Sequence, residues 1–116
     1  MKLKLIMALV DDSHTTAILK AAREAGATGA TVVTSVRGEG LEPEKTFLGL
    51  DLSGQRDLLM FLVAEEVSRT VLEEIAAVGQ FDKRHGAGIA FQLAIEDAMG
   101  LGSQMETISH EIEERL

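Results

Sequence analysis

The sequence has 116 residues, of which 46% are hydrophobic and 26% charged, and this fits a single globular domain with one core. It has no cysteine, which excludes disulfides and thiolate metal sites, and its net charge of −8 and lack of tryptophan and tyrosine count against nucleic acid as a partner. With no apolar run of about 18 residues and no signal-peptide pattern, the sequence predicts a cytoplasmic protein that is not embedded in a membrane.

The first part of the chain reads as strand, helix and strand. Residues 2–10 are apolar with no breaker, which predicts a buried strand. The Asp-Asp-Ser cluster at 11–13 is typical of an N-cap, and a helix follows to about residue 25. Residues 28–36 are β-branched and predict a second strand. Residues 37–45, with glycines and the only proline, predict an exposed loop.

The second part repeats the pattern. Residues 56–64 predict a buried strand, 65–78 an amphipathic helix that begins with glutamates, and 88–96 another strand. The alternating stretch 46–52 either extends the sheet as a hairpin or moves with the preceding loop. The tail from residue 105 predicts a short acidic helix, whose apolar side docks on a partner or on a neighbouring subunit if it is not simply solvated.

The resulting order is βαββαβ, the pattern of an α+β, ferredoxin-like sandwich. Two helices cover only one face of such a sheet. Because the strands also carry apolar residues for the other face, we expect the chain to bury that face by forming an oligomer.

Two glycine-containing loops are the candidates for a ligand site. Gly38 and Gly40 follow the second strand, and the stretch 83–88, Lys-Arg-His-Gly-Ala-Gly, precedes the last strand. Backbone N–H groups of such loops can hold phosphate, although each loop on its own is also explained as a plain connection. In an oligomer of this fold, the two loops can face each other across an interface.

Catalytic and metal chemistry have no candidates in the sequence. His14, His85 and His110 lie in different segments without ligand spacing, so the sequence predicts no metal site. No serine lies in a nucleophile elbow, and no nucleophile is matched to a base. We therefore expect a protein that is not an enzyme.

Three segments together resemble the PII family of nitrogen-regulatory signal-transduction proteins. Residues 19–40, LKAAREAGATGATVVTSVRGEG, are similar to its first helix, its second strand and the start of its T-loop. Residues 62–75, LVAEEVSRTVLEEI, and 86–98, GAGIAFQLAIEDA, are similar to its second helix and to its B-loop and last strand.

The resemblance implies a ferredoxin-like subunit in a barrel-like homotrimer that binds an adenine nucleotide between subunits. The ligand would be ADP, AMP or a cyclic nucleotide, bound as a signal rather than as a cofactor. The nucleotide-binding residues that it implies, with the basic neighbours, are Thr31, Arg37, Gly38, Gly40, Lys83, Arg84, Gly86, Ala87 and Gly88.

The sequence also departs from the family pattern. Ile89 stands at the place of the B-loop lysine, and Gly100 and Gly102 stand at the places of two arginines. Each lost cation removes a contact worth roughly 1.5–3 kcal/mol. Arg37, Lys83 and Arg84 are the local replacements, which favours a PII-like protein with a different or less charged nucleotide.

The predicted function is that of a PII-like protein that regulates a partner, with a membrane transporter as the partner class. The predicted domain spans 1–104, with a T-loop region at about 37–56, and residues 105–116 form the acidic tail. Two alternatives remain open: a trimeric adaptor with a vestigial ligand cleft, and a metal-responsive trimer like the CutA-like divalent-cation tolerance proteins.

Overall fold

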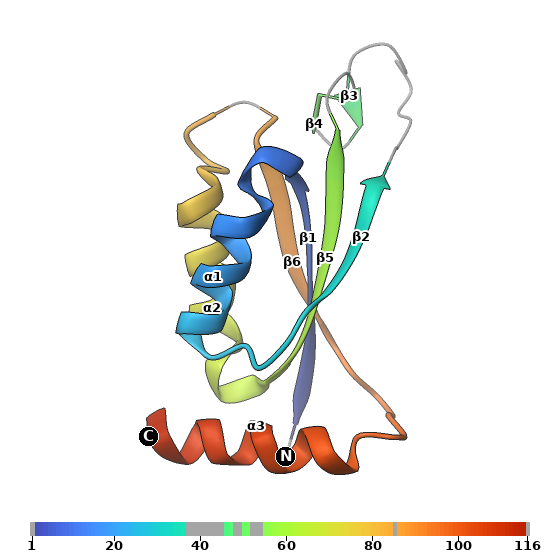
Figure 1. Cartoon of the computed structure of the whole chain (residues 1–116), viewed down its shortest axis with the longest axis vertical. Helices are drawn as coiled ribbons and strands as arrows, with labels where there is room; N and C mark the ends of the chain where they lie inside the picture. Colours follow the sequence, from blue (N-terminus) through green and yellow to red (C-terminus); the bar gives the residue numbers. More distant parts are fainter. Residues whose placement is uncertain (1, 37–45, 48–49, 52–54, 85, 116) are drawn as a thin grey trace.

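A computed structural model describes residues 2–36, 46–47, 50–51, 55–84 and 86–115. The helices and strands are shown in Figure 1. In chain order they are β1 (Leu3–Asp11), a 3-10 turn η1 (Asp12–His14), α1 (Thr15–Ala25), β2 (Thr31–Val36), β3 (Thr46–Phe47), β4 (Leu50–Asp51), β5 (Arg56–Ala64), α2 (Glu65–Gly79), β6 (Gly88–Ala94) and α3 (Gly102–Arg115).

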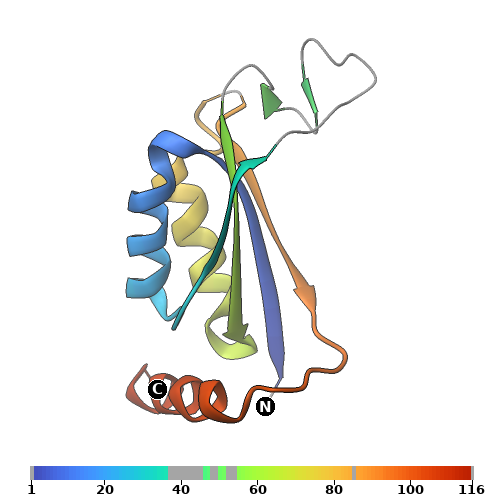
Figure 2. The same cartoon turned by 45° about the vertical axis from the view of Figure 1, so that its right-hand side comes forward.

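The main sheet has four strands in the order β2-β5-β1-β6, and each neighbouring pair is antiparallel. Helices α1 and α2 lie side by side on one face of this sheet (Figures 1 and 2). The predicted α+β, ferredoxin-like βαββαβ order is therefore confirmed. The short strands β3 and β4 pair with each other in a separate two-stranded sheet, so the described part of 46–52 does not extend the main sheet.

The helices begin and end at residues that suit those positions. Asp11 caps η1, since its carboxylate accepts hydrogen bonds from the backbone N–H of Ser13 at 3.0 Å and from its hydroxyl at 2.8 Å. Glutamates occupy the first turn of α2, where the helix dipole favours negative charge. α2 ends at Gln80, whose backbone is left-handed. These local signals help to set where η1 begins and where α2 begins and ends.

The core lies between these helices and the sheet. Alternate residues of β1 and β5 point into it, and Ile6 pairs with Phe61 while Ala8 pairs with Leu59. Ile18 from α1 and Ile75 from α2 close it from the other side. All of these side chains are buried, as the period-two pattern of strands and the helical spacing require.

The opposite face of the sheet is apolar and carries neither α1 nor α2. Its side chains form rows across β6, β1 and β5. The rows are Leu93–Leu5–Leu62, Phe91–Met7–Met60 and Ile89–Leu9–Leu58. Phe91 is 40% exposed and Leu93 46% exposed. We call these rows the open face, and they are the surface for which the sequence predicted a partner.

Strand β2 contains a bulge. Val33 pairs with Leu58 and Val36 with Arg56, so β2 uses one residue more than β5 over the same distance. Ser35 has φ +58°, which is uncommon for a non-glycine residue and is typical of a bulge. The bulge turns the strand shortly before residue 37.

Helix α3 crosses one end of the sandwich, close to the N-terminus (Figures 1 and 2). It begins at Gly102, earlier than the predicted helix. Ile108 is only 3% exposed and joins the core, with Ile112 packed beside it. The apolar side of the tail therefore packs on its own subunit. The division of the chain at residue 104 stays a prediction. Among the described residues, no helix combines the length and the apolar character that crossing a membrane requires.

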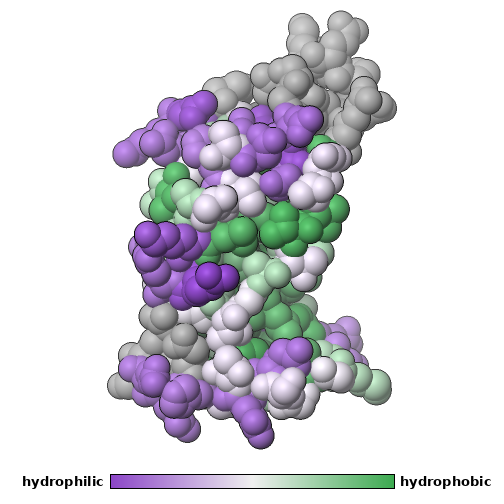
Figure 3. Space-filling model, viewed as in Figure 1, coloured by the Kyte–Doolittle hydropathy of each residue, from purple (hydrophilic) through white to green (hydrophobic). Residues whose placement is uncertain are grey.

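Figure 3, viewed from the same side as Figure 1, shows green, hydrophobic atoms in the middle of this face of the molecule, with a group of purple, hydrophilic atoms beside them on the left. Purple atoms also gather toward both ends.

Candidate functional site

The loop between α2 and β6 contains most of the predicted ligand-binding residues. The backbone N–H groups of Lys83 and Arg84 both donate to the carbonyl of Gln80 at 3.1 Å. The N–H of Ala87 donates to the carbonyl of Arg84, also at 3.1 Å. Gly86 has φ +73°, a backbone conformation that favours glycine. These hydrogen bonds make the segment a compact turn rather than an extended connection.

A buried arginine holds this loop from the inside. The guanidinium of Arg56, at the start of β5, donates to the carbonyl of Gly86 at 2.8 Å and reaches that of Ala87 at 3.5 Å. Arg56 is 5% exposed. Hydrogen bonds from a charged donor are stronger than neutral ones, and a guanidinium can serve two acceptors at once. The carbonyls of 86 and 87 therefore face the protein.

Two carboxylates, Asp11 and Asp57, lie near the start of β5. Asp11 is the partner of Arg56 across β1 and β5. The pKa of Asp11 is lowered, first by the backbone N–H and then by the hydroxyl of Ser13, with a smaller contribution from the charge of Arg56. Asp57, which is 7% exposed, accepts a hydrogen bond of 2.6 Å from the hydroxyl of Thr15. The cluster ties the start of β5 to the start of α1 and to the 83–88 loop.

Gly88 has a packing role. A Cβ at this position would lie 2.9 Å from the carbonyl oxygen of Leu9 and would collide with the ring of Phe81. The same ring covers Gly79. Glycine is therefore needed at 88 for Phe81 to pack between α2 and β6, whether or not a ligand binds nearby.

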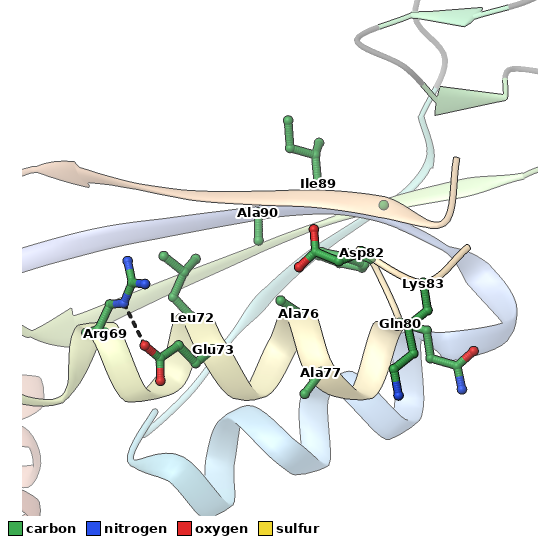
Figure 4. Close-up of a pocket in the computed structure, with 12 residues that line it drawn as sticks. Arg69, Leu72, Glu73, Ala76, Ala77, Gln80, Asp82, Lys83, Ile89 and Ala90 are labelled. Carbon is green, nitrogen blue, oxygen red and sulfur yellow. Dashed lines mark hydrogen bonds and ion pairs between the residues drawn. The ribbon is translucent and has the colours of Figure 1, made fainter. Parts of the chain in front are cut away.

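A groove of about 520 Å³ runs beside this loop, between α2 and β6 (Figure 4). Ala90 points from β6 toward α2, whereas Ile89 points to the opposite side of the strand (Figure 4). Both charge signs line the groove: Arg69 forms an exposed ion pair of 2.7 Å with Glu73, and Lys83 lies near Asp82 in the chain. The groove has no cationic surplus that would select an anion.

Thr31 lies far from that loop. It is exposed at the beginning of β2, whereas β6 lies at the other edge of the sheet, with β5 and β1 between them. Thr31 lines a separate pocket of about 280 Å³ with Met60 and Leu62 of the sheet and with Gln104 and Ile108 of α3. We call this the α3 pocket.

The structure thus brings together only part of the predicted site. Lys83, Arg84, Gly86, Ala87 and Gly88 share one loop, and Thr31 is apart from them. Arg37, Gly38 and Gly40 lie outside the described residues. The site assignment as a whole stays a prediction.

The described part of the chain contains no group of three or more His, Asp or Glu side chains that is arranged to hold a metal ion. His110 instead forms an ion pair of 2.9 Å with Glu114 along α3. His85 is not among the described residues.

Arg56 and Gln104 are not among the site residues predicted from the sequence. Arg56 is the first residue of the predicted strand 56–64, and a cation at the start of a buried strand is a signal that could have been tested. Gln104 ends the stretch GLGSQ, which has two glycines and lies between the predicted last strand and the predicted tail helix.

Comparison with known proteins gives one family. The model of the family described as nitrogen regulatory protein P-II matches residues 3–104. No curated protein matches the sequence significantly.

Solved structures agree in fold. A PII-like signalling protein from Thermus thermophilus is 24% identical, with a TM-score of 0.60, over 82% of this chain and 88% of that one. CPII from Thiomonas intermedia, a nitrogen regulatory PII-like protein, is 19% identical in its apo form, with a TM-score of 0.62, over 82% of this chain and 90% of that one. The same protein with ADP, AMP and acetate gives 19% identity and a TM-score of 0.60, over 83% and 90%.

Proposed function

Since this chain belongs to the nitrogen regulatory protein P-II family, we propose that it is a non-enzymatic signalling protein that binds an adenine nucleotide between subunits and thereby regulates a partner protein. The observation that carries this proposal is the separation of the predicted ligand residues. Thr31 lies at one edge of the sheet and the 83–88 loop at the other. A site made of both requires a second copy of the chain.

The open face supports such an assembly. Its in-register rows of leucine, methionine, isoleucine and phenylalanine form a contiguous apolar surface, and such surfaces mark interaction sites on proteins. A closed ring of subunits that points these faces inward buries all of them equally. The resemblance to the PII family favours three subunits.

In this arrangement the β6 edge of one subunit approaches the β2 edge of the next. The ligand then lies between Thr31 on one side and the 83–88 loop on the other, with Lys83 and Arg84 near its phosphates. Crystals of CPII from Thiomonas intermedia that contain ADP and AMP support this ligand class. The net charge of −8 makes local cations essential for any anion to bind.

Regulation would act through the segment between β2 and β5. Its sequence includes Glu39, Glu42 and Glu44, so a partner that recognises it should present a basic surface. The cytoplasmic side of a membrane transporter is such a surface, because cytoplasmic loops carry an excess of Lys and Arg. Ligand would shift the population of this segment between states that differ in affinity for the partner.

Titration calorimetry with ADP, AMP and cyclic AMP tests the ligand. We expect saturable binding of one of them to the wild type, weakened about tenfold by the double change Lys83→Ala and Arg84→Ala, because each cation supplies a charge-assisted contact. The control is the double change Lys20→Ala and Arg23→Ala on the exposed side of α1, which alters the net charge equally. If nucleotide affinity falls equally in both double variants, the loss comes from the change in net charge, and the assignment of Lys83 and Arg84 to the site is contradicted.

A trimeric adaptor without a small ligand is the second candidate. Two observations favour it. The packing of Phe81 already explains why residue 88 is glycine, without any ligand. The carbonyls of 86 and 87 accept hydrogen bonds from Arg56 inside the protein. If calorimetry detects no nucleotide while the protein remains an oligomer, this candidate replaces the first.

A further inference from the structure

Helix α3 forms one wall of the α3 pocket. The pocket has apolar walls from Met60 and Leu62 on β5 and from Ile108 on α3, and its polar groups include Thr31 and Gln104. Its volume of about 280 Å³ lies just below the roughly 300–1,000 Å³ of sites that hold a whole small molecule. It therefore suits one ring system of a larger ligand.

The packing of α3 places Gln104 at the α3 pocket. Ile108 lies one turn further along the helix and is 3% exposed in the core. Residues four apart share a helix face, so the anchor at 108 directs 104 to the same side. The N–H of Met105 donates to the carbonyl of Leu101 at 2.8 Å, which holds the first turn of α3 in place. Gln104 is itself exposed, and its amide oxygen accepts a local bond of 3.2 Å from the hydroxyl of Ser103.

The chemistry of this wall matches a purine base. A carboxamide presents a donor and an acceptor side by side, and these pair with the N6 amine and the N7 acceptor of adenine. Guanine offers two acceptors, O6 and N7, at the same edge, so one of the two hydrogen bonds would be lost. Met60, Leu62 and Ile108 supply apolar surface for the faces of the ring.

The phosphates need cations outside this pocket. Arg56, which pairs with Val36 at the other end of β2, is 5% exposed and its guanidinium holds the loop carbonyls, so it is not presented to a ligand. Because β2 is bulged, Thr31 and Val36 span only the four steps from Met60 to Arg56 on β5, about 13 Å at roughly 3.3 Å per residue. A nucleotide with its base at Thr31 would therefore meet Lys83 and Arg84 of a neighbouring subunit with its phosphates, as in the proposed function.

We propose that Gln104, on the C-terminal helix, contacts the base of the bound nucleotide and selects adenine over guanine. This assignment rests on the proposed function. It gives α3, most of which lies outside the segment matched by the family model, a role in ligand recognition.

The test compares ADP, GDP and inorganic pyrophosphate by calorimetry in the wild type and in Gln104→Leu. Gln104 is exposed on a helix, and leucine is a good helix former, so the variant should fold. We expect ADP to bind about tenfold more weakly to the variant, with GDP and pyrophosphate changed less than about twofold. In the wild type, the side-chain NH₂ resonances of Gln104 should move on titration with ADP.

Thr107→Leu is the matched control, since Thr107 is also neutral and exposed on α3 but does not line the α3 pocket. It should bind ADP as the wild type does. If the wild type binds ADP and Gln104→Leu keeps the same ratio of ADP to GDP affinity, the role of Gln104 is overturned and the proposed function stands. If the wild type binds no nucleotide, both are overturned.

Discussion

The guanidinium of Arg56 donates a 2.8 Å hydrogen bond to the carbonyl of Gly86, and so joins the start of one strand to the loop before another. The same side chain reaches the carbonyl of Ala87, and Asp11 is its partner on the neighbouring strand. Arg56 is almost completely buried. The shape of the candidate ligand loop therefore depends on a residue outside it.

Removing this guanidinium should destabilise the fold. Arg56→Met fills similar space but leaves the loop carbonyls without their charged donor, so we expect the free energy of unfolding to fall by about 2–3 kcal/mol in urea denaturation. Arg56→Lys should recover part of the loss, since it restores the charge without the two-pronged geometry.

Arg69→Met is the control, because Arg69 is exposed and its ion pair with Glu73 is worth only about 0.5 kcal/mol. Equal losses for Arg56→Met and Arg69→Met would show that the contacts of Arg56 contribute little.

Gly88→Ala should also destabilise the protein, by roughly 1–3 kcal/mol, because the new Cβ meets Phe81 and the carbonyl of Leu9. Gly29→Ala serves as the comparison, since a Cβ there would meet nothing within 4 Å. Thermal unfolding monitored by circular dichroism measures both. A Gly88→Ala protein as stable as the wild type would mean that Phe81 moves aside easily, and the glycine would then need another explanation.

The open face predicts how the oligomer can be dissociated. Phe91→Glu places a charge in the middle row of that face, where association would have to bury it without a partner. We expect light scattering to report monomers for this variant at concentrations where the wild type is oligomeric. Met99→Glu adds the same charge at a fully exposed position outside the rows and should leave the oligomer intact. Oligomers that survive Phe91→Glu would place the interface elsewhere.

The pH dependence of stability should reveal Asp11. Its pKa in the folded protein is lowered from about 3.8, chiefly by the hydrogen bonds from Ser13. A group with a depressed pKa stabilises the fold above its unfolded pKa, and that stability is lost as the pH falls through the folded pKa. Asp11→Asn should therefore be less stable than the wild type at neutral pH, and the difference should shrink below about pH 3.8.

Urea denaturation at a series of pH values measures this difference. Asp12→Asn removes the same charge from an exposed neighbour and controls for the net charge. A gap between wild type and Asp11→Asn that stays constant as the pH falls well below the unfolded pKa would contradict the assignment.

Local patterns in the sequence were sufficient to predict the strands, the two main helices and their order, because burial on one face imposes a period of two or of about 3.6. The roles of Arg56 and Gly88 could not be predicted in that way. Arg56 depends on Gly86, which is distant in the sequence, and Gly88 depends on Phe81, which lies on the other side of a turn. Periodicity carries no information about such pairs. The bulge at Ser35 was missed because residues 31–36, TVVTSV, have no regular alternation of apolar and polar side chains that an extra residue would interrupt.

The tail shows the same limit. Met105, Ile108 and Ile112 have the spacing of a helix face, but spacing alone does not say which surface that face contacts. Burial of Ile108 in the core of its own subunit answers this question. A short helix that is held by few side chains can detach while the rest of the domain stays folded.

Ile108→Ala should therefore act locally. A fully buried isoleucine in a closed core costs about 2–5 kcal/mol when truncated, but here the loss cannot exceed the free energy that holds α3 in place. We expect amide hydrogen exchange to become fast along 102–115 while β1 and β5 keep their protection. Ile75→Ala in the centre of the core is the comparison, and it should weaken protection throughout the sheet. If Ile108→Ala also weakens β1 and β5, then α3 is an integral part of the domain, and the proposed role of Gln104 would belong to a fixed wall rather than to a detachable one.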